Sequence, residues 1–248
     1  MHPVLFHLGP IALPAFGALI AIGLMAALML SLRTAAITGL NPDRLWNAGL
    51  FVLLSAFVLS RLLLVVTYMH AFLSYPFLLL AVPSLTPLGL LLTAAATVIY
   101  LRFRRLPILT VLDAWAPCAT LAWVFLALGH FAEGSDPGLP TSLPWGMAMI
   151  AEGVRLHPVA LYAAVVAALL TAALLRQLFH RGRPGDTVAT ALVAAGLAQF
   201  LLTFLRQLGL EAERFGNLLD PIQWAALAMI IVAGFIWLLP RRPVPHAV

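Results

Sequence analysis

Charged residues are scarce in this chain. Aspartate, glutamate, lysine and arginine make up 9% of its 248 residues, whereas hydrophobic residues make up 63% and the mean hydropathy is +1.04. A soluble domain has about a quarter charged residues, so this composition excludes an ordinary soluble fold. No polar stretch is long enough to form a second domain. We therefore expect residues 1–248 to form a single polytopic membrane domain.

Cysteine is almost absent and lysine is missing. The single cysteine, Cys118, lies in an apolar run, which excludes an internal disulfide and predicts a buried, unreactive thiol. All fourteen basic residues are arginine, and they form no basic stripe, so the net charge of +5 favours lipid headgroups over nucleic acid as partners. Metal-binding and phosphate-loop motifs are also lacking, and we expect neither a metal nor a cofactor.

Apolar runs of the length needed to cross a bilayer, about 20 residues, are frequent. They centre on residues 12–32, 47–67, 85–101, 109–128, 158–177, 187–205 and 221–239. These runs predict an all-α integral membrane protein with seven transmembrane helices. Segment 70–84 is too short and too rich in proline to span, so we expect it to be interfacial or re-entrant.

Arginine is unevenly distributed between the two sets of loops. Ten of the fourteen arginines follow the first, third, fifth or seventh apolar run. Loops rich in arginine stay on the cytoplasmic side of a membrane. The pattern therefore predicts an N-terminus outside the cell and a cytoplasmic C-terminus.

Polar side chains gather at the ends predicted to face outward. His130 and Asp136 follow the fourth run. Near the outer end of the sixth run, Gln199, Thr203 and Arg206 recur at i, i+4 and i+7, which predicts one helix face. Such a face points away from lipid, and arginine suits a phosphate by its charge and its fork of donors. Two interpretations stand: a polar cavity at the level of the headgroups, or an ordinary polar outer surface.

Two charged residues lie inside or at the edge of apolar runs. Arg61, near the outer end of the second run, must extend to the interface, find a partner or face a wet cavity, because an unpaired charge in lipid is costly. Asp113, at the start of the fourth run, is expected to pair with a loop arginine or to cap its own helix.

Several stretches, in the same order, resemble motifs of the bacterial prolipoprotein diacylglyceryl transferases. "RFRRLPILTVLDAWAP" is similar to the family's arginine-rich loop and its Asp-x-x-x-Pro motif, and "RLHPVALYAA" resembles His-Pro-x-Gln-Leu-Tyr-Glu. "GLAQFLLTFLR" is similar to Gly-x-x-Arg-Phe-x-x-Glu-Phe-x-Arg. "HPVLFHLGPIALPAFGALIAIG" resembles the family's N-terminus, and "SRLLLVV" resembles a segment of its second span. The resemblance covers nearly the full length.

The stretch "LALGHFAEGSDPG", residues 126–138, is similar to the family signature Gly-Arg-x-Gly-Asn-Phe-x-Asn-Gly-Glu-x-x-Gly. The residues that form the scaffold of this motif are kept: Gly129, Phe131, Gly134 and Gly138. The chemical residues differ. Ala127 stands at the signature arginine, and Gln199 and Thr203 stand at the arginine and glutamate of the sixth-span motif. We expect the backbone path to be retained and the chemistry to be changed.

The resemblance implies an inner-membrane, multi-pass protein of a bacterium. Members of the family move the diacylglyceryl group of phosphatidylglycerol onto the lipobox cysteine of a lipoprotein precursor and release glycerol phosphate at the outer face. The catalytic residues would be His130, His157 and Arg206, with either histidine acting as acid or base. The residues expected to bind the lipid or its phosphate are Arg61, Arg155, Tyr162, Gln199 and Thr203.

Two functions remain open. The first is a phospholipid-dependent diacylglyceryl transferase whose activity is reduced or redirected, because one lost charge-stabilising donor can lower a rate by about 10²–10³. The second is a catalytically silent lipid-binding subunit of a larger membrane protein assembly. A transporter is less favoured, because the sequence shows neither an internal repeat nor paired broken helices.

Overall fold

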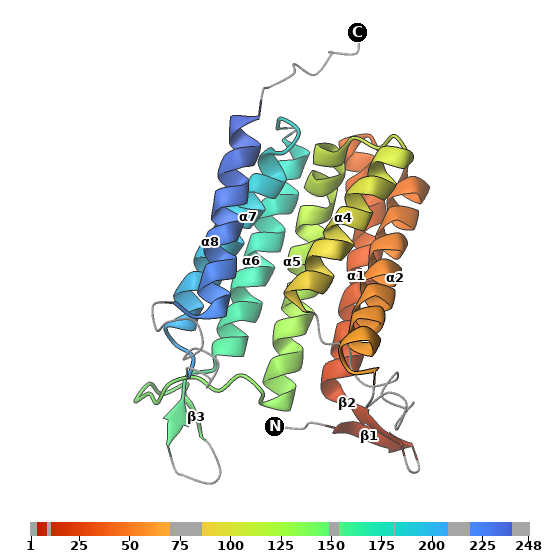
Figure 1. The fold of residues 1–248 in the computed structure, drawn as a ribbon. Helices are drawn as coiled ribbons and strands as arrows, with labels where there is room; N and C mark the ends of the chain where they lie inside the picture. Colours follow the sequence, from red (N-terminus) through yellow and green to blue (C-terminus); the bar gives the residue numbers. More distant parts are fainter. Residues whose placement is uncertain are drawn as a thin grey trace.

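The structure, a computed structural model, describes residues 4–8, 11–69, 86–148, 154–180, 182–207 and 219–239. These residues form a helical bundle with two short hairpins at one end (Figure 1). The helices are α1 (Ala15–Thr38), α2 (Pro42–Thr67), α4 (Pro87–Phe103), α5 (Ile108–Glu133), α6 (Val159–Phe179), α7 (Asp186–Thr203) and α8 (Pro221–Leu238). Antiparallel hairpins are formed by β1 (Val4–Leu8) with β2 (Ile11–Pro14) and by β3 (Met147–Ala148) with β4 (Arg155–Leu156).

Helix α5 is the central element of the bundle. It packs most extensively against α1 and α6, while α7 packs against α8, and α2 packs against α1 and α4 (Figure 1). Small residues allow close helix contacts, as is usual in membrane proteins. A Cβ added to Gly196 of α7 would lie 2.8 Å from the carbonyl oxygen of Ala226 in α8.

The sides of the bundle are apolar, as expected of a protein that lies in a membrane. Large hydrophobic side chains such as Val66, Leu91, Leu169 and Phe235 are each at least 66% exposed. Within the described part of the chain, six helices are long and apolar enough to cross a membrane, whereas α4 has 17 residues and is shorter. The prediction of a multi-pass, helical membrane protein is confirmed, with helices at all seven predicted runs. The count of seven spans stays a prediction, and segment 70–84 lies outside the described residues.

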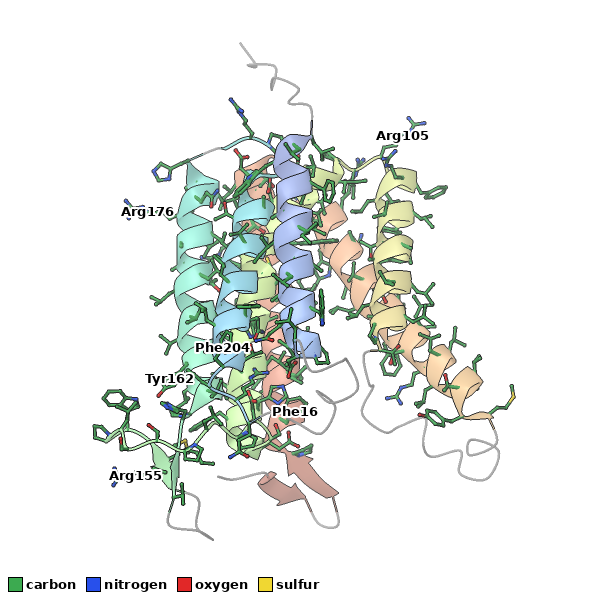
Figure 2. All side chains as sticks on the ribbon, turned by 60° about the vertical axis from the view of Figure 1, so that its left-hand side comes forward. Phe16, Arg105, Arg155, Tyr162, Arg176 and Phe204 are labelled. Carbon is green, nitrogen blue, oxygen red and sulfur yellow. The ribbon has the colours of Figure 1, made fainter. Side chains whose placement is uncertain are left out.

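The two ends of the bundle are named here by residues that they hold. Arg105 and Arg176 lie at one end, here called the Arg105 end, whereas Arg155 and Tyr162 lie at the other (Figure 2). The second end also holds the end of α5 with His130, and it is called the His130 end. The arginine asymmetry predicts that the Arg105 end is cytoplasmic. This orientation stays a prediction.

The buried carboxylate of Asp113 joins two helices at the Arg105 end. Its two oxygens accept hydrogen bonds from the backbone N–H groups of Gly185, at 2.6 Å, and Val188, at 2.8 Å. Asp113 thus caps the N-terminus of α7 although it belongs to α5. The expectation that Asp113 pairs with an arginine or caps its own helix was wrong. The reason is tertiary, because the start of α7 lies beside α5 and offers unpaired amides.

Cys118 is buried in α5, as the sequence predicts, with 5% of its surface exposed. Its sulfur lies 3.8 Å from the Thr34 hydroxyl of α1. The thiol therefore belongs to the contact between these two helices and lies apart from the polar residues of the His130 end.

Candidate functional site

Three loop segments form a small ribbon at the His130 end. Residues 137–141, which follow α5, run between residues 155–157, which precede α6, and residues 205–207, which follow α7. The Leu139 N–H donates to the Leu205 carbonyl at 2.8 Å, and the His157 N–H donates to the Leu139 carbonyl at 3.0 Å. This loop ribbon fixes the three connections relative to one another.

Gly138 is at the centre of the loop ribbon and pairs with Arg206. A Cβ at this position would lie 2.2 Å from the carbonyl oxygen of His157, which no real side chain tolerates. Gly134 has a different role, because it ends α5 with a φ of +74°, a conformation that favours glycine. Gly129 packs against Phe16. These kept glycines of the signature thus have backbone or packing reasons.

A cavity of about 190 Å³ opens beside the loop ribbon, and we call it the polar cavity. Its walls come from α5, α6, α7 and α8, with apolar surface from residues such as Trp123, Ala163 and Ile222. Its polar side chains are His130, Asp136, Gln199 and Arg206. Ala127 also lines it. Ala127 and Gln199, the two positions where the resemblance places arginines of the family, therefore meet in one cavity with Arg206.

Arg206 reaches the polar cavity by a route that the sequence did not predict. The spacing with Gln199 and Thr203 predicted one helix face, which is wrong for Arg206, because α7 ends at Thr203 and Arg206 belongs to the loop ribbon. The turn after the helix brings the guanidinium back to the cavity. Thr203 is buried, donates its hydroxyl to the Phe200 carbonyl and does not line the cavity.

The charge of Arg206 is paired. Its Nη2 lies 3.0 Å from the Asp136 Oδ2, and the two side chains are 22% and 17% exposed. The buried Arg206 Nε has no hydrogen-bond partner among the described residues, and the same holds for the buried Gln199 Oε1. Both residues line the polar cavity, and each carries one buried atom without a hydrogen-bond partner among the described residues.

His130 lies in the last turn of α5 and lines the polar cavity. Its Nδ1 is 2.8 Å from the Ser135 hydroxyl, and its ring packs 5.0 Å from the ring of Phe16. These two contacts orient the imidazole. If Nδ1 carries the proton and donates to Ser135, Nε2 is left as a proton acceptor.

Three other predicted site residues lie together but do not line the polar cavity. The Tyr162 hydroxyl accepts a hydrogen bond from the Trp145 indole at 2.9 Å and lies 3.4 Å from the His157 Nδ1. Arg155 is exposed and donates to the Pro144 carbonyl at 3.4 Å. Figure 2 shows Arg155 and Tyr162 at the loop side of the His130 end.

Arg61 is separate from these groups. It lies on α2, which packs against α1 and α4, and does not line the polar cavity. Its side chain is 7% exposed, and its guanidinium carbon lies 5.3 Å from the centre of the Phe57 ring. The sequence left open whether Arg61 extends to the interface, finds a partner or faces a wet cavity. Its contact with the Phe57 ring fits the second of these, a partner.

Asp136 is the site residue that sequence reasoning missed. It stands at an unspecified position of the family signature, so the resemblance assigns it no role. Its partner, Arg206, is 70 positions further along the chain, so no local pattern links the two. Only the loop ribbon reveals the pair.

The fold and the polar cavity define a multi-pass helical membrane protein with a charged site at one end of its bundle. The model of the family described as prolipoprotein diacylglyceryl transferase matches residues 3–239, and the chain belongs to this family.

Three similar curated proteins, each named phosphatidylglycerol--prolipoprotein diacylglyceryl transferase, match almost end to end. That of Clostridium tetani is 26% identical over 97% of this chain and 98% of its own. That of Trichormus variabilis is 28% identical over 99% and 93%, and that of Geobacter sulfurreducens is 30% identical over 94% and 96%.

Proposed function

We propose that this protein binds a phospholipid by its headgroup in the polar cavity, at the outer face of a bacterial cytoplasmic membrane. It then transfers the diacylglyceryl group to an acceptor thiol. We expect this transfer to be slower than in relatives that have arginines at the positions of Ala127 and Gln199. The observation that carries this proposal is the meeting of Arg206 and His130 with Ala127 and Gln199 in one cavity. Family membership supports the type of reaction and a lipoprotein precursor as the acceptor.

The side chains of the cavity suit distinct steps of this reaction. The thiol gives its proton to His130, and its sulfur forms a bond to the glyceryl carbon of the lipid. The bond between that carbon and the phosphate oxygen breaks, and the phosphate ester leaves with the bonding electrons. Arg206 compensates the negative charge of this leaving group, and the proton returns from His130 to the phosphate.

The same cavity explains the expected slow rate. Neither Ala127 nor Gln199 can supply a positive charge, and the charge of Arg206 is shared with Asp136. Removing one preorganised donor costs a factor of about 10²–10³ in rate. Because the cavity is partly enclosed, water compensates only part of this loss.

A second function is favoured by the ion pair itself. Arg206 is paired with the carboxylate of Asp136. A site with this pair can bind a headgroup without stabilising the negative charge of a leaving phosphate. The protein would then be a catalytically silent lipid-binding subunit, and its partners would be other membrane proteins.

Two experiments test both functions. The first measures transfer of a labelled diacylglyceryl group from phosphatidylglycerol in nanodiscs to a lipobox peptide. The second is complementation of a strain that lacks its own transferase. We expect slow transfer by the wild type, none by Arg206→Ala, and unchanged transfer by Arg176→Ala at the opposite end of the bundle. A rate equal to that of relatives with both arginines would refute the expected reduction. If transfer is absent but lipid binding depends on Arg206, the silent function replaces the enzyme, and if no lipid is bound, both are refuted.

A further inference from the structure

We propose that the polar cavity selects a zwitterionic phospholipid with a primary amine in its headgroup, such as phosphatidylethanolamine, over a lipid with a net negative charge. This inference rests on the proposed function, since it requires that the cavity bind a headgroup. It follows from the charges and the hydrogen-bonding groups of the described residues that line the cavity.

The formal charges of the described residues that line the cavity are balanced. Among the described residues that line it, Arg206 is the cation and Asp136 is the anion, at a distance of 3.0 Å. Arginines at positions 127 and 199, as in the family motifs, would add two positive charges. Their replacement by Ala127 and Gln199 removes the excess of positive charge that would attract an anion.

An anionic headgroup fits this balance poorly. Its phosphate must compete with Asp136 for the guanidinium of Arg206. It also places a second negative charge near the Asp136 carboxylate, which is only 17% exposed. Like charges in a partly desolvated site disfavour binding, and this repulsion is a way to reject a partner.

An amine-bearing headgroup avoids this conflict. Its phosphate faces Arg206 while its ammonium group faces Asp136, so that positive and negative charges alternate and none is left unpaired. The phosphate ester and the ammonium group are separated by two carbons in ethanolamine, which lets both reach the two ends of one ion pair.

The polar residues of the cavity fit the same ligand. The guanidinium of Arg206, which lines the cavity, suits a phosphate oxygen. The side-chain amide of Gln199, which also lines it, has a carbonyl oxygen that suits an ammonium hydrogen. A choline headgroup carries the charge but has no N–H to donate. A glycerol headgroup has hydroxyl donors but no positive charge for Asp136.

The choice of headgroup leaves the transferred group unchanged. In both lipids the diacylglyceryl carbon is bonded to a phosphate oxygen, and the same carbon–oxygen bond breaks. Only the leaving phosphate ester differs, which is phosphoethanolamine for the amine-bearing lipid.

Native mass spectrometry of the full-length protein can measure this selection directly. The detergent-purified protein is offered equal amounts of phosphatidylethanolamine, phosphatidylcholine and phosphatidylglycerol with the same acyl chains. We expect bound phosphatidylethanolamine to exceed each of the others by about tenfold, which corresponds to about 1.4 kcal/mol. Arg206→Ala is expected to lose all three lipids.

Variants of the carboxylate test its role. Asp136→Asn is expected to abolish or reverse the preference over phosphatidylglycerol, because it frees the charge of Arg206. Asp136→Glu should keep the preference. Glu133→Gln, an equal change at an exposed residue just before the same loop, should not alter it. Size-exclusion profiles verify folding, and should the asparagine variant misfold, the wild-type ratio and the glutamate variant decide.

The outcomes separate this inference from the proposed function. Two results overturn the headgroup selection alone. One is binding that depends on Arg206 but favours phosphatidylglycerol. The other is a ratio of bound phosphatidylethanolamine to phosphatidylglycerol that Asp136→Asn does not change. Absence of any bound lipid, or binding that Arg206→Ala leaves intact, overturns lipid binding in the polar cavity altogether.

Discussion

A methyl group added at Gly138 is expected to open the loop ribbon and to disturb the polar cavity. In Gly138→Ala the new Cβ would lie 2.2 Å from the His157 carbonyl oxygen and 2.9 Å from a methyl carbon of Val159. Neither neighbour can move freely. The His157 carbonyl accepts the Val159 N–H at 2.9 Å, and the His157 N–H is bonded to Leu139.

The cost can be worked out from these contacts. Overpacking of a tight site costs about 1–3 kcal/mol, and each lost hydrogen bond adds about 0.5–1.5 kcal/mol. With one or two ribbon hydrogen bonds broken, we expect a loss of about 2–4 kcal/mol in the free energy of unfolding. For a protein of this size that corresponds to a fall of roughly 5–15 °C in Tm.

Thermal unfolding of the purified protein in detergent is the assay, with retention of phosphatidylethanolamine as a second measurement. Retention should also fall, because Gly138 pairs with Arg206. The control is Gly234→Ala in α8, where a Cβ meets no atom within 4 Å and helix propensity favours alanine. The reasoning is refuted if Gly138→Ala has the Tm and lipid retention of the wild type.

Three further predictions concern other parts of the molecule. Asp113→Ala should lower the free energy of unfolding by about 2–4 kcal/mol, because α7 loses two hydrogen bonds to a carboxylate, and an unchanged Tm would contradict this role. Gln199→Arg should raise the diacylglyceryl transfer rate by up to about 10²-fold, since it restores a charged donor in the polar cavity, whereas an unchanged rate would argue for the silent function. In a Cys118→Ala background, Phe103→Cys should be labelled by a thiol reagent only from the cytoplasm and Trp145→Cys only from outside, and the reverse pattern would overturn the predicted orientation.

The helices were predictable because a membrane imposes strong constraints on composition. A spanning helix needs a long apolar run, and each of the predicted runs is occupied by a helix whose ends differ by a few residues. The hairpin of β3 and β4 was not predictable, because strands of two residues show no periodicity. Asp113 was misjudged because its partners, Gly185 and Val188, are distant in sequence.

The candidate site was predictable in part. His130, Gln199 and Arg206 were expected together, and all three line the polar cavity. Arg155, His157 and Tyr162 lie at the same end of the bundle but do not line the cavity. A sequence cannot tell which side of a loop faces a cavity. That distinction separates Arg206 from His157, whose backbone belongs to the same loop ribbon but whose imidazole contacts Tyr162 instead.

Backbone and cavity residues are constrained by different physical requirements, and this explains the mixed signature of residues 126–138. Gly134 and Gly138 are required by the fold itself, through a left-handed φ and a close backbone contact, whatever ligand is bound. Ala127 and Gln199 line the cavity, where a bound ligand influences which charge is favourable. Replacing arginines at such positions leaves the scaffold intact and changes which ligand charge the cavity favours. The proposed change of headgroup therefore requires no change in these scaffold glycines, and in that proposal the carboxylate of Asp136 beside Arg206 is the group that favours an amine-bearing lipid.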